Sequence, residues 1–265
     1  MRWIKQRRRS QLRKRPFPPT WNTILERSVP IYPHLPAPDQ QELKRHIQVF
    51  LSEKRFEGAA GLQMTDEIRV CIAAHACILL LHRNTDYYPA LYSVIVYPHT
   101  YLAKRSDRDP LGLVTERLEP RAGESWTLGT VVLAWDAVAR AVSSVAGCRN
   151  VAFHEFAHQL DGEDGQVNGA PILSDRSQYE AWERILGREY QQLKRDVQQG
   201  SPTILHPYGA TNPAEFFAVV TECFFTHPGP LRQRHPKLYA QLRHYFRQDP
   251  VRFLAEEAGD RTPRS

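Results

Sequence analysis

Residues 151–161 read VAFHEFAHQLD, and they predict a buried helix that carries a metal site. Histidines four residues apart lie one turn above each other on the same helix face, so His154 and His158 can reach one ion. Glu155 lies beside them, where its carboxylate can take a proton from an attacking water. The apolar neighbours are typical of a helix packed on a core. The pattern favours a metal-dependent hydrolase over the alternative, two surface histidines on an amphipathic helix.

A catalytic zinc ion usually has three protein ligands, so a third ligand is needed. The metzincin pattern would place Gly at 161 and His at 164, but this chain has Asp161 and Asp164, of which Asp164 remains a candidate ligand. We favour Glu215, in the apolar segment NPAEFFAVVTE at 212–222, because an inward-facing carboxylate there needs a partner that offsets its desolvation. The alternative is a capping box, in which Glu215 bonds the backbone N–H of Asn212.

Two further carboxylates are candidates for holding the imidazoles in place. Glu222 lies seven residues after Glu215 on the same helix face, and Asp161 lies three residues after His158. Either carboxylate can accept a hydrogen bond from a ligand ring. The alternatives are a solvated glutamate and an aspartate that bonds the helix end or the following loop.

Apolar periodicity places helices on both sides of a region with β character. A helix begins at Asp39 and stops at Gly58, and Thr65 caps a second helix, almost wholly apolar through residue 81. Two β-rich runs predict strands at residues 91–97 and 130–135. The polar stretch between them predicts a loop or a weak hairpin. Helical patterns return at residues 150–160, 174–198, from 212 onward and at 236–246.

The first fifteen residues differ in charge from the rest of the chain. They hold eight Lys or Arg and no Asp or Glu, so the formal net charge of +6 becomes 6 − 8 = −2 for residues 16–265. We expect a basic disordered tail at 1–15, which could contact RNA, DNA or anionic lipid, and one compact domain at 16–265. Within that domain, a helical part covers about 16–85, opening with an irregular Pro-rich lead-in, and a sheet and active-site part covers about 86–250. Because the body is not basic, we expect no direct nucleic-acid binding.

Cysteine usage and hydropathy bear on the compartment. The four cysteines form no CxxC pair and are too few for a secreted disulfide framework, which favours a reducing cytoplasm: they are Cys71, Cys77, Cys148 and Cys223. The longest apolar stretch, residues 68–81, is too short to cross a bilayer, and we expect no membrane association.

Over about residues 20–250, the chain resembles the Mlc titration factor A family of zinc-dependent peptidases. The likeness is carried by HEFAHQLD at 154–161, NPAEFFAV at 212–219, Tyr97-Pro98 and Leu133-Ala134-Trp135. The resemblance implies an α+β fold: a zincin-like metallopeptidase core of the gluzincin kind, related to lethal factor, with a small mixed sheet and a mainly helical N-terminal part. The basic first fifteen residues are not a feature of that family.

The resemblance also implies a set of site residues. His154, His158 and Glu215 would bind one catalytic zinc ion, and Glu155 would be the general base. Tyr208, seven residues before the ligand glutamate, would stabilise the oxyanion. Without the family, Tyr208 is an aromatic residue in a turn.

A cytoplasmic, aminopeptidase-like zinc metallopeptidase is the function that this resemblance implies, with peptides or proteins as substrates and a Mlc-like transcriptional repressor as a further partner. We expect an extended substrate to pair with the strand at 130–135. One alternative is a peptidase-like binding module that sequesters the repressor, with hydrolysis incidental. Another is a structural metal whose fourth ligand would be His206.

Overall fold

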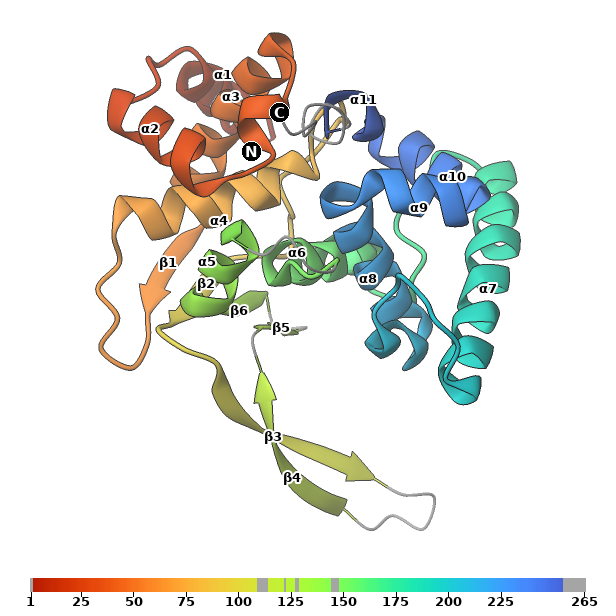
Figure 1. Ribbon diagram of the computed structural model, residues 1–265. Helices are drawn as coiled ribbons and strands as arrows, with labels where there is room; N and C mark the ends of the chain where they lie inside the picture. The colour runs from red at the N-terminus through yellow and green to blue at the C-terminus, as the bar shows by residue number, and fades with distance from the viewer. Residues whose placement is uncertain (1, 109–113, 122, 127–128, 144–147, 255–265) are drawn as a thin grey trace, which may run out of the picture.

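A computed structural model describes residues 2–108, 114–121, 123–126, 129–143 and 148–254 (Figure 1). Their elements are, in chain order, α1 (Arg2–Arg13), α2 (Pro19–Ser28), η1 (Tyr32–His34), α3 (Ala37–Glu53), β1 (Arg55–Gly58), α4 (Asp66–Ile78), β2 (Ser93–Tyr97), β3 (Tyr101–Arg108), β4 (Val114–Arg121), β5 (Gly123–Trp126), β6 (Thr130–Ala134), α5 (Trp135–Ser143), α6 (Val151–Asp161), η2 (Gly162–Asp164), α7 (Arg176–Gln199), η3 (Pro207–Ala210), α8 (Pro213–Thr226), α9 (Pro228–Arg234), α10 (Pro236–Phe246) and α11 (Val251–Leu254). The α+β class that we expected is confirmed.

A small mixed sheet has the strand order β1-β2-β6-β5. Strands β1, β2 and β6 are parallel, and β5 runs antiparallel to β6. The expectation that residues 130–135 offer a free strand edge is wrong, because β6 lies between β2 and β5 and Trp135 begins α5. The edge strand on this side is β5. Strands β3 and β4 form a hairpin where we expected a loop or a weak hairpin, and it extends away from the helices (Figure 1).

Helix α4 is the central buried helix that its apolar sequence predicts. The Thr65 hydroxyl accepts a hydrogen bond from the Ile68 backbone N–H, and every residue from Val70 to Ile78 is buried. The helix packs against α2 and α3 on one side and α6 on the other. His75 shows the close fit to α6, because its ring lies edge-on to that of Phe153 with the centroids 5.0 Å apart. The site helix α6 is thus supported from behind by the core.

The prediction of a disordered tail at residues 1–15 is wrong, because residues 2–13 form helix α1. Arg9 is 1% exposed and donates two hydrogen bonds of 2.7 Å to the carboxylate of Glu53, on α3. Its guanidinium also pairs with Asp86, and Leu12 packs in the core. A bidentate arginine–carboxylate pair satisfies a buried guanidinium, so a basic segment can be anchored by partners far along the chain. Counting charges within the segment could not reveal those partners.

The Pro-rich lead-in also contains regular structure that the sequence analysis did not predict. Helix α2 has Pro19 in its first turn, where proline is tolerated because that backbone N–H has no helical partner. Among the side chains of this segment, Leu25 and Tyr32 are buried, and Trp21 and Ile24 pack partly buried against the core.

A disulfide joins Cys148, just before α6, to Cys223 on α8, with their Cα atoms 4.5 Å apart. Cys71 and Cys77 are buried free thiols, as their place in the apolar helix suggested. The paired cysteines are a feature that the sequence analysis did not expect. In the described part of the chain, no helix has the length and hydropathy that a membrane span requires.

Candidate metal centre

Helix α6 is fixed in place by its cap and by its apolar face. The Asn150 side chain accepts a hydrogen bond of 3.0 Å from the Phe153 backbone N–H, which caps the first turn. One face of the helix is buried in the core through Phe153, Phe156, Ala157 and Leu160. The two histidines four residues apart therefore share the other face, as the sequence predicted.

The third side chain of the cluster, that of Glu215, lies on helix α8. Asn212 caps this helix by accepting a hydrogen bond of 2.9 Å from the Glu215 backbone N–H. The Glu215 side chain does not take the capping-box role, because its Oε2 lies 2.9 Å from Nε2 of His154 and 3.4 Å from Nε2 of His158. The carboxylate of Glu215 thus meets both rings of α6.

The spacing of these three groups fits a single metal ion. The two Nε2 atoms of His154 and His158 lie 3.2 Å apart, and one ligand atom from each of the three residues lies within 4.8 Å of the others. Ligand atoms at 2.0–2.1 Å from a tetrahedral zinc ion are about 3.3 Å apart, close to the separations found here. Two imidazoles and one carboxylate are also the donor set of catalytic zinc sites with an open position.

Glu222 lies seven residues, about two turns, after Glu215 on α8 and holds the His154 ring from behind. Its Oε1 lies 2.7 Å from Nδ1 of His154, and its other oxygen accepts a hydrogen bond from the Asn150 backbone N–H. Glu222 is buried, so the alternative of a solvated glutamate is wrong. Such a bond fixes the ring orientation and leaves Nε2 directed toward the shared point.

Glu155 lies next to the three ligand candidates and is buried, with 4% of its surface exposed. Burial raises the pKa of its carboxyl group to about 7. Its Oε2 has no hydrogen-bond partner among the described residues. A carboxyl group with a pKa near neutrality can both accept and return a proton at physiological pH.

Strand β5 passes directly over this part of α6 at Gly123. A Cβ atom at this position would lie 2.6 Å from both Oε1 of Glu155 and a methyl group of Val151, closer than real contacts allow. Glycine is thus needed for the strand to approach the helix. Neither Gly123 nor the buried Asn150 was singled out from the sequence. The cap position of Asn150, just before an apolar helix, was a usable signal, whereas nothing local marks Gly123.

Asp161 holds the loop after α6 rather than a ligand ring. Its Oδ2 accepts a hydrogen bond of 2.8 Å from the Gly169 backbone N–H, and the Gly169 carbonyl accepts one from the Trp182 indole. Neither Oδ1 of Asp161 nor Nδ1 of His158 has a hydrogen-bond partner in the described part of the chain. Asp164, the other candidate ligand, is exposed and bonds the Gln166 backbone N–H instead.

The turn at 206–210 places Tyr208 beside the cluster. The Tyr208 ring is 6.0 Å from the His154 ring, centroid to centroid, and about half of its surface is exposed. His206 accepts a hydrogen bond from the Tyr208 backbone N–H through its Nδ1. It is not part of the only three-residue metal-ligand group found among the described residues. The structure therefore does not support His206 as a fourth ligand.

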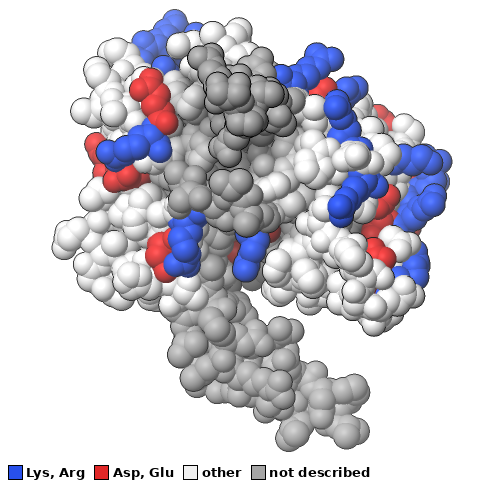
Figure 2. Space-filling model, viewed as in Figure 1, with Lys and Arg blue, Asp and Glu red and all other residues white. Residues whose placement is uncertain are grey.

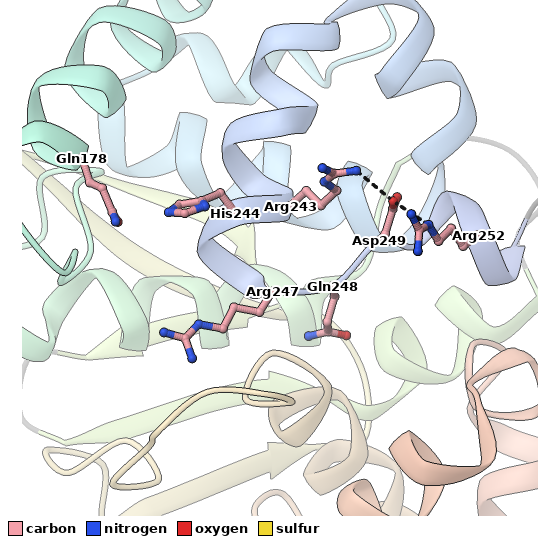
Figure 3. A pocket seen from close by; sticks show the side chains of 7 residues that line it. All are labelled: Gln178, Arg243, His244, Arg247, Gln248, Asp249 and Arg252. Atoms are coloured by element: carbon pink, nitrogen blue, oxygen red, sulfur yellow. Dashed lines mark hydrogen bonds and ion pairs between the residues drawn. The ribbon is translucent and has the colours of Figure 1, made fainter.

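An open surface pocket of about 460 Å³ lies elsewhere, among α7, α10 and α11 (Figure 3). Two of its arginines, Arg243 and Arg252, point to the same carboxylate, that of Asp249, each at 3.2 Å. No candidate site residue lines this pocket, so it is separate from the metal centre.

The donor set and the buried acid beside it define a class of protein, the metallopeptidases. The chain belongs to one family of this class, the glucose-regulated metallo-peptidases M90, whose family profile matches residues 3–247. The resemblance stated from the sequence is thereby confirmed. Membership of this family implies a metal cofactor, which the converging ligand atoms are suited to hold.

Curated relatives match the chain over most of its length. An uncharacterized protein of Synechocystis sp. (strain ATCC 27184 / PCC 6803 / Kazusa) is 44% identical, over 92% of this chain and 89% of the relative. The Mlc titration factor A of Klebsiella pneumoniae subsp. pneumoniae is 30% identical, over 87% of this chain and 86% of the relative. That of Yersinia pestis (strain Pestoides F) is 29% identical, over 87% and 85%.

Proposed function

We propose that this protein is a zinc-dependent peptidase of the aminopeptidase type, with a gluzincin-like catalytic core, that acts on peptides or proteins in the cytoplasm. The observation that carries the proposal is the convergence of His154, His158 and Glu215 on one point, with the buried carboxyl group of Glu155 beside it. Zinc is the preferred ion because imidazole and carboxylate ligands with an open tetrahedral position suit it.

Each residue of the site has a distinct task in this mechanism. His154, His158 and Glu215 hold the ion, which when bound supplies Lewis-acid polarisation of the scissile carbonyl and acidifies a water. Glu155 accepts the proton of the attacking water and returns it to the leaving amine, a task that suits a pKa near 7.

Glu222 and Tyr208 complete the site. Glu222 keeps the His154 ring aligned through the bond to its Nδ1. Tyr208, whose ring lies beside that of His154, donates a hydrogen bond from its hydroxyl group that stabilises the oxyanion of the tetrahedral intermediate.

Strand β5 is our proposed docking edge for the substrate. It forms the end of the sheet next to β6, and at Gly123 its backbone lies against Glu155 and Val151 of α6. An extended peptide that pairs with this edge gains main-chain hydrogen bonds and lies next to the general base. The absence of a side chain at Gly123 lets this strand lie so close to Glu155.

The substitution Glu155→Gln tests the mechanism. The variant should bind the same amount of zinc as the wild-type protein but hydrolyse amino-acid anilides and peptides about 10²–10⁴-fold more slowly, since the proton acceptor is lost. Metal analysis and initial rates, with and without chelator, measure both quantities. Near wild-type rates in the variant, or a wild-type rate that chelation leaves unchanged, would contradict the proposal.

A second candidate function is supported by the names of the relatives. Several curated relatives are named Mlc titration factor A, which suggests a Mlc-like transcriptional repressor as a partner. In this alternative, the peptidase fold sequesters the repressor and hydrolysis is incidental. Binding that Glu155→Gln retains, together with a cellular phenotype that needs no turnover, would favour this alternative over the enzyme.

A further inference from the structure

Helix α1 presents two large apolar side chains to solvent at its N-terminal end. Trp3 is 70% exposed and Ile4 is 68% exposed, and they rank among the most exposed large hydrophobic residues that the structure describes. Neither packs in the hydrophobic core. Because the two residues are adjacent, they form one contiguous apolar patch, and exposed apolar patches mark interaction sites.

Basic side chains continue the same exposed face of the helix. Arg7 and Arg8 follow Trp3 and Ile4 at four-residue spacing, and both are exposed, while the Arg8 guanidinium also donates a hydrogen bond of 3.2 Å to the Ser52 hydroxyl on α3. The Arg7 guanidinium lies over the Trp3 ring, 5.5 Å from its centroid. Beyond the helix end, Lys14 and Arg15 are exposed as well. Because residues 1–15 contain no Asp or Glu, this face combines positive charge with two apolar side chains.

The opposite face of α1 attaches the helix firmly to the protein. Arg9 is buried between the carboxylates of Glu53 and Asp86, and Arg13 donates a hydrogen bond of 2.9 Å to the Tyr87 hydroxyl. Leu12 packs in the core. The contacts of Arg9, Leu12 and Arg13 therefore fix the orientation of α1, and Trp3, Ile4 and Arg7 lie on its outer face.

We propose that the outer face of α1, formed by Trp3, Ile4, Arg7 and Arg8 and continued by Lys14 and Arg15, docks the protein on the surface of an anionic lipid bilayer. A short amphipathic helix binds such a surface by burying apolar side chains at the headgroup boundary while Lys and Arg meet the lipid charges. A rigidly held helix pays little ordering entropy on docking. This reverses the expectation of no membrane association that we drew from the sequence.

Lipid fits this face better than nucleic acid does. A tryptophan can stack on a base, but an isoleucine has no such role, whereas both side chains can enter a lipid interface. The net charge of residues 16–265 is −2, so the body as a whole carries no excess of positive charge to attract a polynucleotide backbone. Figure 2 shows Lys and Arg side chains over the N-terminal helices of Figure 1, with Asp and Glu side chains among them.

Vesicle co-sedimentation of the full-length protein tests the proposal. The wild-type protein should sediment with vesicles of phosphatidylglycerol and phosphatidylcholine, should not sediment with phosphatidylcholine alone, and should be released by salt. The double variants Trp3→Ser with Ile4→Ser, and Arg7→Gln with Arg8→Gln, should each bind at least about ten-fold more weakly.

Matched controls remove exposed residues of the same kinds from other elements. These controls are Tyr92→Ser, at a side chain that is 71% exposed, and the double variant Arg232→Gln with Arg234→Gln on α9; both should bind vesicles as the wild-type protein does. Thermal unfolding and zinc content should be unchanged in every variant, because the outer face does not contribute to the core or to the metal centre.

Three results would overturn the docking proposal: no binding to anionic vesicles, equal loss in the α1 variants and the controls, or binding to a duplex DNA or RNA oligonucleotide that exceeds vesicle binding and depends on the same four residues. The outcome is independent of the proposed peptidase function, because the assay needs no turnover.

Discussion

Two clusters in this molecule each combine two histidines with one glutamate, yet only one of them has the geometry of a metal site. In the first, His154 and His158 stand one turn apart on α6, and Glu215 reaches both from α8. Their ligand atoms converge on a single point. The rings approach from one helix and the carboxylate from another, so an ion between them would close the cluster.

The second cluster lies between α3 and the segment after α4. Glu42 stands between two rings, with one oxygen 3.2 Å from Nε2 of His46 and the other 3.4 Å from Nδ1 of His82. Each ring has a second partner, because His46 Nδ1 lies 2.7 Å from the Tyr87 hydroxyl and His82 Nε2 lies 3.2 Å from Asp39. The carboxylate of Glu42 separates the two rings, and contacts with carboxylates and with the Tyr87 hydroxyl occupy their nitrogen atoms. Residue types alone therefore do not define a metal site; convergence of their ligand atoms does.

Removing the central glutamate from each cluster should produce the largest difference in zinc binding between the two clusters. We expect Glu215→Ala to weaken zinc binding by more than about 100-fold, since changes outside the ligand shell already cost 10–100-fold. The matched variant Glu42→Ala should keep full zinc content. Metal analysis after dialysis against a graded chelator series measures both affinities. Equal zinc retention in the two variants would remove the assignment of the first cluster as the metal centre.

A smaller difference should follow from removing the partner of one Nδ1 atom in each cluster, that of His154 in the first and that of His46 in the second. Glu222→Gln should weaken zinc binding by about ten-fold, because the charged acceptor that fixes the His154 ring becomes a neutral amide. Tyr87→Phe, which removes the partner of His46 Nδ1, should leave zinc affinity unchanged. Competition with a chelating dye reports the two affinities. If both variants lose zinc to the same degree, the effect is general destabilisation rather than loss of ring alignment.

Much of the fold followed from periodicity in the sequence. The predicted central helix, the site helix and the last long helix correspond to α4, α6 and α10, because each is long and either apolar or regularly amphipathic. The short strands β1 and β5 were missed, since four residues carry little pattern of their own. Helix α1 was missed because its anchor, Arg9, is buried by carboxylates 44 and 77 residues away.

The sequence predicted those parts of the candidate site that lie within one helix better than the contacts between segments distant in the chain. The spacing of His154 and His158 predicts a shared helix face from two positions alone. Glu215 and Glu222 contact His154 from 61 and 68 residues away. The apolar character of their helix indicated that these carboxylates need partners, but it did not identify His154. Asp161 shows the limit, because the same spacing argument placed it near His158, whereas its bonded oxygen holds Gly169. The position of a carboxylate near a ring does not decide which group it bonds.

The second cluster should reveal itself in acid stability, which is the smallest effect we expect. The pKa of Glu42 is lowered from 4.5 to about 2, chiefly by its hydrogen bond to His46 and also by one from the His82 backbone N–H. A carboxylate with a lowered pKa stabilises the folded state above pH 4.5, and this contribution is lost as the pH falls from about 4.5 to about 2. Because the Glu42 side chain is 33% exposed, solvent screening keeps the contribution below about 1 kcal/mol.

The midpoint of thermal unfolding, measured on chelator-treated protein, can detect a contribution of this size. Glu42→Gln should unfold at most about 2–4 °C below the wild-type protein near pH 6, and the difference should close as the pH approaches 2. Glu57→Gln is a suitable control, because Glu57 pairs with Arg55, which is 79% exposed, and screening leaves such a pair little to contribute. A Glu42→Gln deficit that persists unchanged at pH 2 would mean that packing, and not the ionised carboxylate between the two rings, stabilises this cluster.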